Sequence, residues 1–126
     1  MVYKYSLEEL KKIAETMADS AEPPVSFFLE GDIGAGKTTF SKFFITKILL
    51  DKNQQITSPT FNIIQIYETI KGPLWHVDLY RLKRKDELFE LGIIEAMHEY
   101  LCLIEWPGIL KNFSKGCNVK ILNLNP

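Results

Sequence analysis

A glycine-rich segment at residues 31–38 is the part of the sequence whose residue types and spacing point most directly to chemistry. It fits the P-loop pattern G-x-x-x-x-G-K-[ST] at every fixed position. Glycines let such a loop turn its backbone N–H groups inward around phosphate oxygens. The spacing predicts that Lys37 reaches the β and γ phosphates of a nucleotide and that the Thr38 hydroxyl binds Mg²⁺. The predicted phosphate-binding residues are Asp32, Ile33, Gly34, Ala35, Gly36, Lys37, Thr38 and Thr39.

A P-loop site also needs a carboxylate that holds Mg²⁺, and this carboxylate usually ends a neighbouring buried strand. Glu105 closes the apolar run at residues 101–104 and is the candidate for that role. The alternative for Glu105 is a solvated strand end. Trp106 follows immediately, and it either packs against the base or ribose of the nucleotide or belongs to the core or the sheet edge.

A second acid, Asp78, lies in a strand-like segment at residues 75–80. The period-2 alternation of that segment places His76, Asp78 and Tyr80 on one face, which predicts a wet cleft on that side. Asp78 is the candidate to orient or deprotonate an attacking water, or to help hold the metal. The alternative is an exposed hairpin face. A lone histidine such as His76 is more often a structural hydrogen-bonding residue than a catalyst.

Two further features allow both a functional and a plain structural interpretation. Thr60 lies in the loop after the P-loop helix, where GTPase-like proteins place a sensor of the γ-phosphate, but a plain turn is the alternative. The run Arg81–Lys85 is basic. Such runs usually form a solvated face, and the functional alternative is a docking surface for an acidic partner or RNA.

The elements that must position these residues alternate between strands and helices. A capping-box pattern at Ser6 and Glu9, followed by apolar residues at helical spacing, predicts a helix over residues 7–19. The other predicted elements are strands at 2–5, 25–30, 61–67, 74–80, 101–105 and 119–124, and helices at 37–50, 86–91 and 93–100. The strands at 61–67 and 74–80 read as an antiparallel pair. We therefore expect an α/β fold, a P-loop NTPase-like three-layer sandwich with a mixed central sheet that includes an antiparallel hairpin.

Length and composition exclude several classes of protein. The 126 residues show no linker, so we expect a single domain over residues 1–126. Fifteen basic and sixteen acidic residues leave a net charge of -1, which argues against charge-driven coating of nucleic acid or membrane. Cys102 and Cys117 are too few for a disulfide framework, and Cys102 reads as a small buried hydrophobe. The absence of an apolar signal segment predicts a cytoplasmic protein with no membrane partner.

Taken together, the motifs resemble the TsaE (YjeE) family, small bacterial P-loop ATPases of tRNA threonylcarbamoyladenosine (t6A) synthesis. The resemblance rests on GDIGAGKTTF at 31–40, TSPTF at 57–61, HVDLYRL at 76–82, Glu87 with Leu91-Gly92 following, and Glu105-Trp106-Pro107. It implies ATP and Mg²⁺ as cofactors and an ATPase that is weak alone and stimulated by partners. It also implies a TsaD–TsaB-type heterodimer as partner, modification of adenosine 37 in tRNAs reading ANN codons, and only indirect contact with tRNA.

The family's site residues map onto this chain by motif. The resemblance implies catalytic roles for Asp78, Lys37 and Thr60, Mg²⁺ ligation by Thr38 and Glu105, and a place for Trp106 near the nucleotide. Two features depart from the family pattern: Ile33 replaces the usual leucine, and the segment from residue 119 lacks an arginine-bearing tail. The alternatives to a partner-dependent ATPase are a small P-loop nucleoside, nucleotide or protein kinase, and a nucleotide-gated binding module.

Overall fold

A computed structural model describes residues 6–32 and 34–125 and shows one mixed five-stranded sheet. The strand order is β2-β3-β4-β1-β5. Strands β3, β4, β1 and β5 run parallel, and β2 pairs antiparallel with β3 at one edge. The strands are β1 (Val25–Glu30), β2 (Ile64–Thr69), β3 (Gly72–Asp78), β4 (Leu101–Glu105) and β5 (Val119–Asn123). The predicted mixed sheet with its antiparallel hairpin is confirmed, while the strand expected at residues 2–5 lies outside the described residues.

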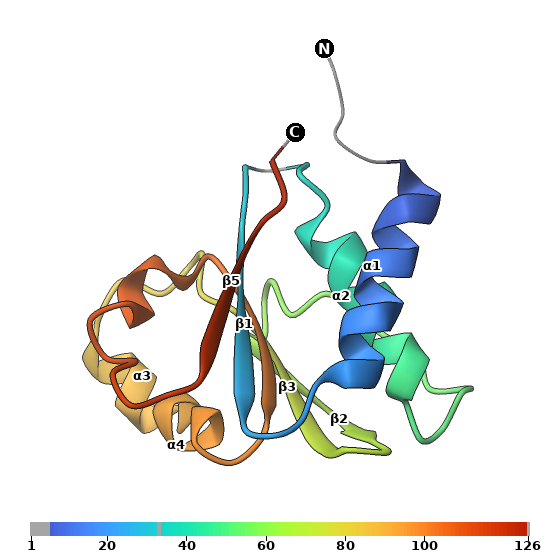
Figure 1. Cartoon of the computed structure of the whole chain (residues 1–126). Coiled ribbons are helices and arrows are strands. Elements are labelled where there is room, and N and C mark those ends of the chain that lie inside the picture. Colours follow the sequence, from blue (N-terminus) through green and yellow to red (C-terminus); the bar gives the residue numbers. More distant parts are fainter. Residues whose placement is uncertain (1–5, 33, 126) are drawn as a thin grey trace.

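Helices cover both faces of this sheet (Figure 1). One face carries α1 (Leu7–Ser20) and α2 (Lys37–Ile48), and the other carries α3 (Asp86–Glu90), α4 (Ile93–Met97) and the 3₁₀ helix η1 (Pro107–Leu110). The three layers match the predicted sandwich. No helix within the described ranges is long and apolar enough to cross a membrane.

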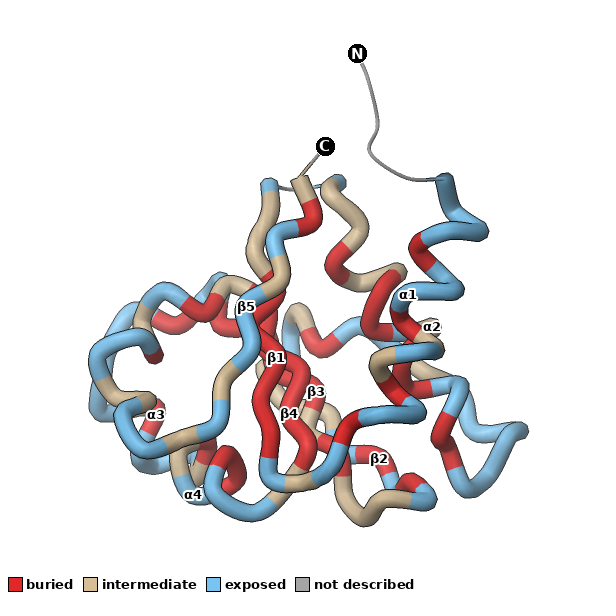
Figure 2. The backbone as a smooth tube through the Cα atoms, in the orientation of Figure 1, coloured by how far each residue is buried: buried red, intermediate tan, exposed pale blue. Residues whose placement is uncertain are grey.

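The central strands are buried on both sides, as Figure 2 shows for β1 and β4. Successive side chains of a strand point to opposite faces, so Phe27 and Leu29 pack under α1 and α2 while Phe28 packs under α3 and α4. This explains why β1 reads as a continuous apolar run and not as an alternating one. The carboxyl ends of β3, β4 and β1 are thereby fixed side by side.

Helix α1 begins as the sequence predicts and extends to Ser20. The Ser6 side chain accepts a hydrogen bond from the Glu9 N–H, and the Glu9 carboxylate accepts one from the Ser6 N–H, both at 3.2 Å. The buried residues of α1 are Leu10, Ala14 and Ala18, a spacing of four that forms one face. This narrow face packs against α2, the helix that follows the phosphate loop.

Several predicted boundaries are wrong, and in two cases a specific contact explains the difference. The strand expected from residue 61 begins at Ile64, because the Ile63 N–H bonds to the Pro59 carbonyl at 2.7 Å and closes a turn. Helix α2 stops at Ile48 and not at residue 50, because Leu49 forms a bridge with Thr69, the last residue of β2. Helices α3 and α4 and the last strand also end one to three residues before the predicted limits, and the strand expected at residues 74–80 spans Gly72–Asp78.

Candidate functional site

The sheet topology gathers the predicted site residues at one edge. The phosphate loop follows β1, Glu105 ends β4, and Asp78 ends β3. In the parallel register Glu105 lies beside Leu29 on one side and beside Asp78 on the other. In open α/β sheets, ligands bind just beyond the carboxyl ends of the strands. The site therefore forms where three neighbouring parallel strands end.

A cavity of about 400 Å³ opens at this edge. Its lining residues are Gly34, Gly36, Lys37, Thr38, Thr39, Thr60, Asp78, Tyr80, Glu105 and Trp106. Of the other predicted phosphate-binding residues, Asp32 lines a neighbouring cavity and Ala35 packs against the core under α1 and α2. Ile33 lies outside the described residues. The structure thus brings most of the predicted site residues around one space.

The glycines of the loop adopt backbone conformations that side chains disfavour. Gly34 and Gly36 have φ angles of 86° and 97°, and α2 begins immediately after Gly36. A Cβ at Gly31 would lie 2.8 Å from the Ala35 Cβ, which is too close for any real contact. The first N–H groups of α2 have no partner within the helix, and the helix dipole adds positive potential there. The loop is therefore suited to receive phosphate oxygens.

Lys37 is buried against its own loop and against Trp106. Its ammonium donates to the carbonyls of Gly31 and Asp32 and lies 3.6 Å from the centre of the Trp106 ring. Burial lowers the pKa of Lys37, while the carboxylates of the site act in the opposite direction. Phosphate oxygens would compete with these carbonyls for the ammonium. Movement or removal of the Lys37 ammonium therefore changes the surroundings of the Trp106 ring directly.

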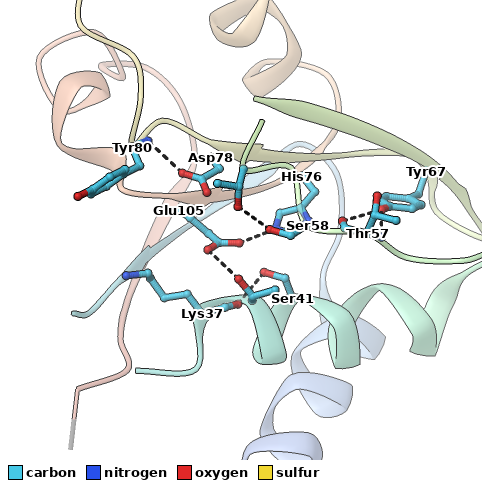
Figure 3. Close-up of polar contacts among 11 residues, drawn as sticks. Lys37, Ser41, Thr57, Ser58, Tyr67, His76, Asp78, Tyr80 and Glu105 are labelled. Carbon is cyan, nitrogen blue, oxygen red and sulfur yellow. Dashed lines mark hydrogen bonds and ion pairs between the residues drawn. The ribbon is translucent and has the colours of Figure 1, made fainter. Parts of the chain in front are cut away.

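Glu105 is buried, with a side chain only 3% exposed. Its Oε2 accepts a hydrogen bond from His76 Nε2 at 2.7 Å (Figure 3). Its Oε1 accepts one from the Thr38 hydroxyl at 3.3 Å. A buried carboxylate persists only when it is paired in this way. The alternative of a solvated strand end is therefore excluded.

The oxygen donors of Thr38 and Glu105 fit Mg²⁺. This ion prefers hard oxygen ligands and usually binds one or two protein groups together with phosphates and waters. Residues 6–32 and 34–125 contain no cluster of three Asp, Glu, His or Cys side chains that could hold an ion by themselves. A metal here would thus depend on phosphate and water for its remaining ligands.

Asp78 is also buried, at 5% exposure, which contradicts an exposed hairpin face. Its Oδ1 accepts a hydrogen bond from the Tyr80 N–H at 3.0 Å. Burial raises the pKa of Asp78, and the Tyr80 N–H opposes this shift. Asp78 and Tyr80 line the cavity, but His76 is completely buried, so the predicted wet cleft does not extend to His76.

Thr60 reaches the same cavity from the loop that precedes β2. Its hydroxyl is hydrogen-bonded to Ser58 at 2.7 Å. The backbone N–H and carbonyl of Thr57 are both bonded to the hydroxyl of Tyr67 on β2. The loop is therefore anchored on the sheet while Thr60 faces the space beside Asp78.

Sequence reasoning did not single out Tyr80 as a site residue. Its ring lies 5.0 Å from that of Trp106, and both line the cavity. The signal that could have found Tyr80 is the period-2 alternation, which places it on the same face as Asp78.

Outside the site, Cys102 is buried and its pKa is raised by burial to about 12, consistent with a small hydrophobe. The basic run Arg81–Lys85 is exposed except at Leu82.

The fold and the loop together define a P-loop α/β domain, and comparison with known proteins identifies its family. A family described as threonylcarbamoyl adenosine biosynthesis protein TsaE matches residues 4–125. The chain therefore belongs to the TsaE family.

Individual relatives support this assignment. A tRNA threonylcarbamoyladenosine biosynthesis protein TsaE from Rickettsia felis is 47% identical over 105 residues, which cover 83% of this chain and 61% of the relative. The protein of the same name from Rickettsia prowazekii is 42% identical, with coverage of 95% and 85%. The crystal structure of YdiB from Bacillus subtilis superposes with a TM-score of 0.65 at 32% identity, covering 97% of this chain and 74% of that one. The chain thus spans about three fifths of the length of the Rickettsia felis relative.

The contact between Lys37 and Trp106 gives a spectroscopic prediction. In a Trp75→Phe variant, Trp106 is the only tryptophan. Addition of ATP should change its fluorescence, because phosphate draws the Lys37 ammonium away from the ring. The same variant with Lys37→Ala should start from a different emission and lack this change. An unchanged emission, with ATP binding confirmed by calorimetry, would contradict the arrangement.

Proposed function

We propose that this protein binds and hydrolyses ATP with Mg²⁺ in the cytoplasm, and that its turnover supports t6A modification of tRNA. The observation that carries the proposal is one cavity in which a phosphate loop meets two buried carboxylates, Glu105 and Asp78, at the ends of adjacent strands. A lysine and a helix N-terminus attract the phosphates, and the carboxylates serve the metal and the water.

The glycine-rich loop and Lys37 would bind the phosphates. The first turn of α2 lies at the cavity edge, which Gly36, Lys37 and Thr38 line. The Lys37 ammonium donates to two backbone carbonyls of the loop, and on nucleotide binding it would exchange them for phosphate oxygens. A charged donor bound to developing negative charge stabilises the transition state more than the ground state.

The metal would be held by the Thr38 hydroxyl and by Glu105 Oε1, whose contact at 3.3 Å brings both oxygens to the same side of the cavity. When bound, Mg²⁺ neutralises charge on the β and γ phosphates. The protein's own contribution is to keep Glu105 paired and fixed in direction inside the fold.

Asp78 is suited to act on water. A general base works best when its pKa lies close to the working pH, and burial shifts the pKa of Asp78 upward in that direction. One carboxylate oxygen is occupied by the Tyr80 N–H, which fixes the group. Thr60 lines the same cavity as Asp78, which supports a role for it as the residue that responds to the γ-phosphate.

The partner and the pathway are inferred from the family. The relatives are named for tRNA threonylcarbamoyladenosine biosynthesis. We propose that this chain acts on a TsaD–TsaB-type heterodimer, contacts tRNA only through that complex, and hydrolyses ATP slowly when alone. The exposed basic residues of the Arg81–Lys85 run lie next to Tyr80 at the cavity and offer a surface for such a complex.

Removing the ammonium of Lys37 tests the proposal. Lys37→Ala should lower steady-state ATP hydrolysis at least ~100-fold, because a charged donor to the transferred phosphate is lost. Lys42→Ala is the matched control, since Lys42 is an exposed lysine on the same helix and should leave the rate unchanged. Hydrolysis in the Lys37→Ala variant at the rate of the control would refute the assignment of the phosphate site.

The raised pKa of Asp78 yields a second prediction that separates activity from stability. Asp78→Asn retains the oxygen that accepts the Tyr80 N–H but removes the charge. Hydrolysis should fall by ~100-fold or more, while ATP affinity stays close to that of the unmodified protein.

The free energy of unfolding of Asp78→Asn should rise, although its rate of hydrolysis falls. Because burial raises the pKa of Asp78 in the folded state, its charge destabilises the fold at neutral pH. Asp78→Asn should therefore stabilise the protein in urea unfolding at neutral pH, with a gain that shrinks as the pH falls toward 3.8, the ordinary value for aspartate. Parallel losses of stability, ATP affinity and hydrolysis would mark Asp78 as a folding residue instead.

A further inference from the structure

His76 is a buried polar residue that the proposed chemistry does not use. It lies on β3, two residues before Asp78, and none of its surface is exposed. Its Nε2 lies 2.7 Å from Glu105 Oε2. Its Nδ1 is buried and has no hydrogen-bond partner among the described residues. The imidazole therefore has one polar contact, and that contact is with the candidate metal ligand.

This arrangement of His76 costs free energy of folding, and packing of the core does not require it. A buried nitrogen without a partner loses its hydration and gains nothing in return. An apolar side chain of similar size would fill the same space without that loss. Since Leu74 and Phe44 on the same side of the sheet are apolar, the layer under α2 does not itself demand a polar group. The contact with Glu105 is what distinguishes a histidine at this position.

The contact fixes which oxygen of Glu105 remains available. Oε2 is hydrogen-bonded to His76 (Figure 3), and Oε1 lies 3.3 Å from the Thr38 hydroxyl. Without a donor at Oε2, the carboxylate would be free to rotate and to present either oxygen to Thr38. A group that hydrogen-bonds to a metal ligand on the side away from the metal fixes the orientation of that ligand. Loss of such a group typically weakens metal affinity roughly 10- to 100-fold.

We infer that His76 is a positioning residue for the divalent ion: it holds Glu105 Oε2 so that Oε1 faces the ion that Thr38 also binds. The inference rests on the proposed function, because it needs a metal–nucleotide site in this cavity. The competing explanation is that His76 only satisfies a buried charge. In that case its loss lowers stability but leaves the affinity for the ion unchanged in the protein that remains folded.

Binding of Mn²⁺ in the presence of saturating ADP, followed by electron paramagnetic resonance, tests the inference without turnover. The amide nitrogen of glutamine extends about as far from Cβ as Nε2 of histidine, whereas that of asparagine is one bond shorter. His76→Asn should therefore weaken Mn²⁺ binding at least ~10-fold, and His76→Gln should restore it to within about threefold. Both variants should keep the ADP affinity measured without metal. His98→Asn, at the exposed second histidine, is the matched control and should change nothing.

Several outcomes would overturn the inference. These are unchanged Mn²⁺ affinity in His76→Asn, equal losses in the Asn and Gln variants, or a matching loss of metal-free ADP affinity. If the unmodified protein with ADP binds no Mn²⁺ at all, the proposed function fails and the inference fails with it. That result differs from the others, in which the unmodified protein binds the ion.

A measurement on the unmodified protein covers the case in which His76→Asn does not fold. Nitrogen NMR of the two histidines should show the ring signals of His76 shift when Mg²⁺ is added to the ADP-bound protein. The signals of His98, which lies beside Cys117, serve as the internal reference and should stay in place. A His76 signal that does not respond to Mg²⁺ would overturn the inference.

Discussion

The buried carboxylate of Glu105 is the group on which the rest of the site depends. It is bonded to His76 on β3 and to Thr38 at the start of α2, so one side chain of β4 connects three elements. A buried charge without partners would be too costly to keep. The parallel register of β3 with β4 and the place of the phosphate loop are therefore linked, because a shift in either would remove one of the two partners of Glu105.

The same region brings two carboxyl groups of like charge, Asp78 and Glu105, close together. Asp78 and Glu105 lie on neighbouring strand ends, and burial raises the pKa of the first and lowers that of Lys37. A nucleotide would add several negative charges to a space already lined by two carboxylates. Lys37, the N-terminus of α2 and a divalent ion are the available compensation. This explains why ATP binding and a metal are expected to depend on each other here, and why the fold gives up some stability at this edge.

The elements that carry the site could be predicted from the sequence, because glycine spacing and apolar runs are local signals. It placed the phosphate loop after β1, Glu105 at the end of β4, and His76 and Asp78 on one face of β3. It did not predict that His76 is buried, since alternation shows which residues share a face but not what covers that face. It also extended a strand through Phe61, which is apolar yet 80% exposed and lies against Arg81. The turn closed between Pro59 and Ile63 makes that strand begin at Ile64, and such a contact leaves no periodic signal in the sequence.

The central claim is that the cavity turns over ATP in response to a partner. The most direct test is steady-state ATP hydrolysis by the protein alone and with the matching TsaD–TsaB pair, with Lys37→Ala as the background. The account predicts slow hydrolysis alone, a several-fold rise with the pair, and none above background in the variant. Hydrolysis that does not respond to the pair, with nucleotide binding confirmed, would contradict it.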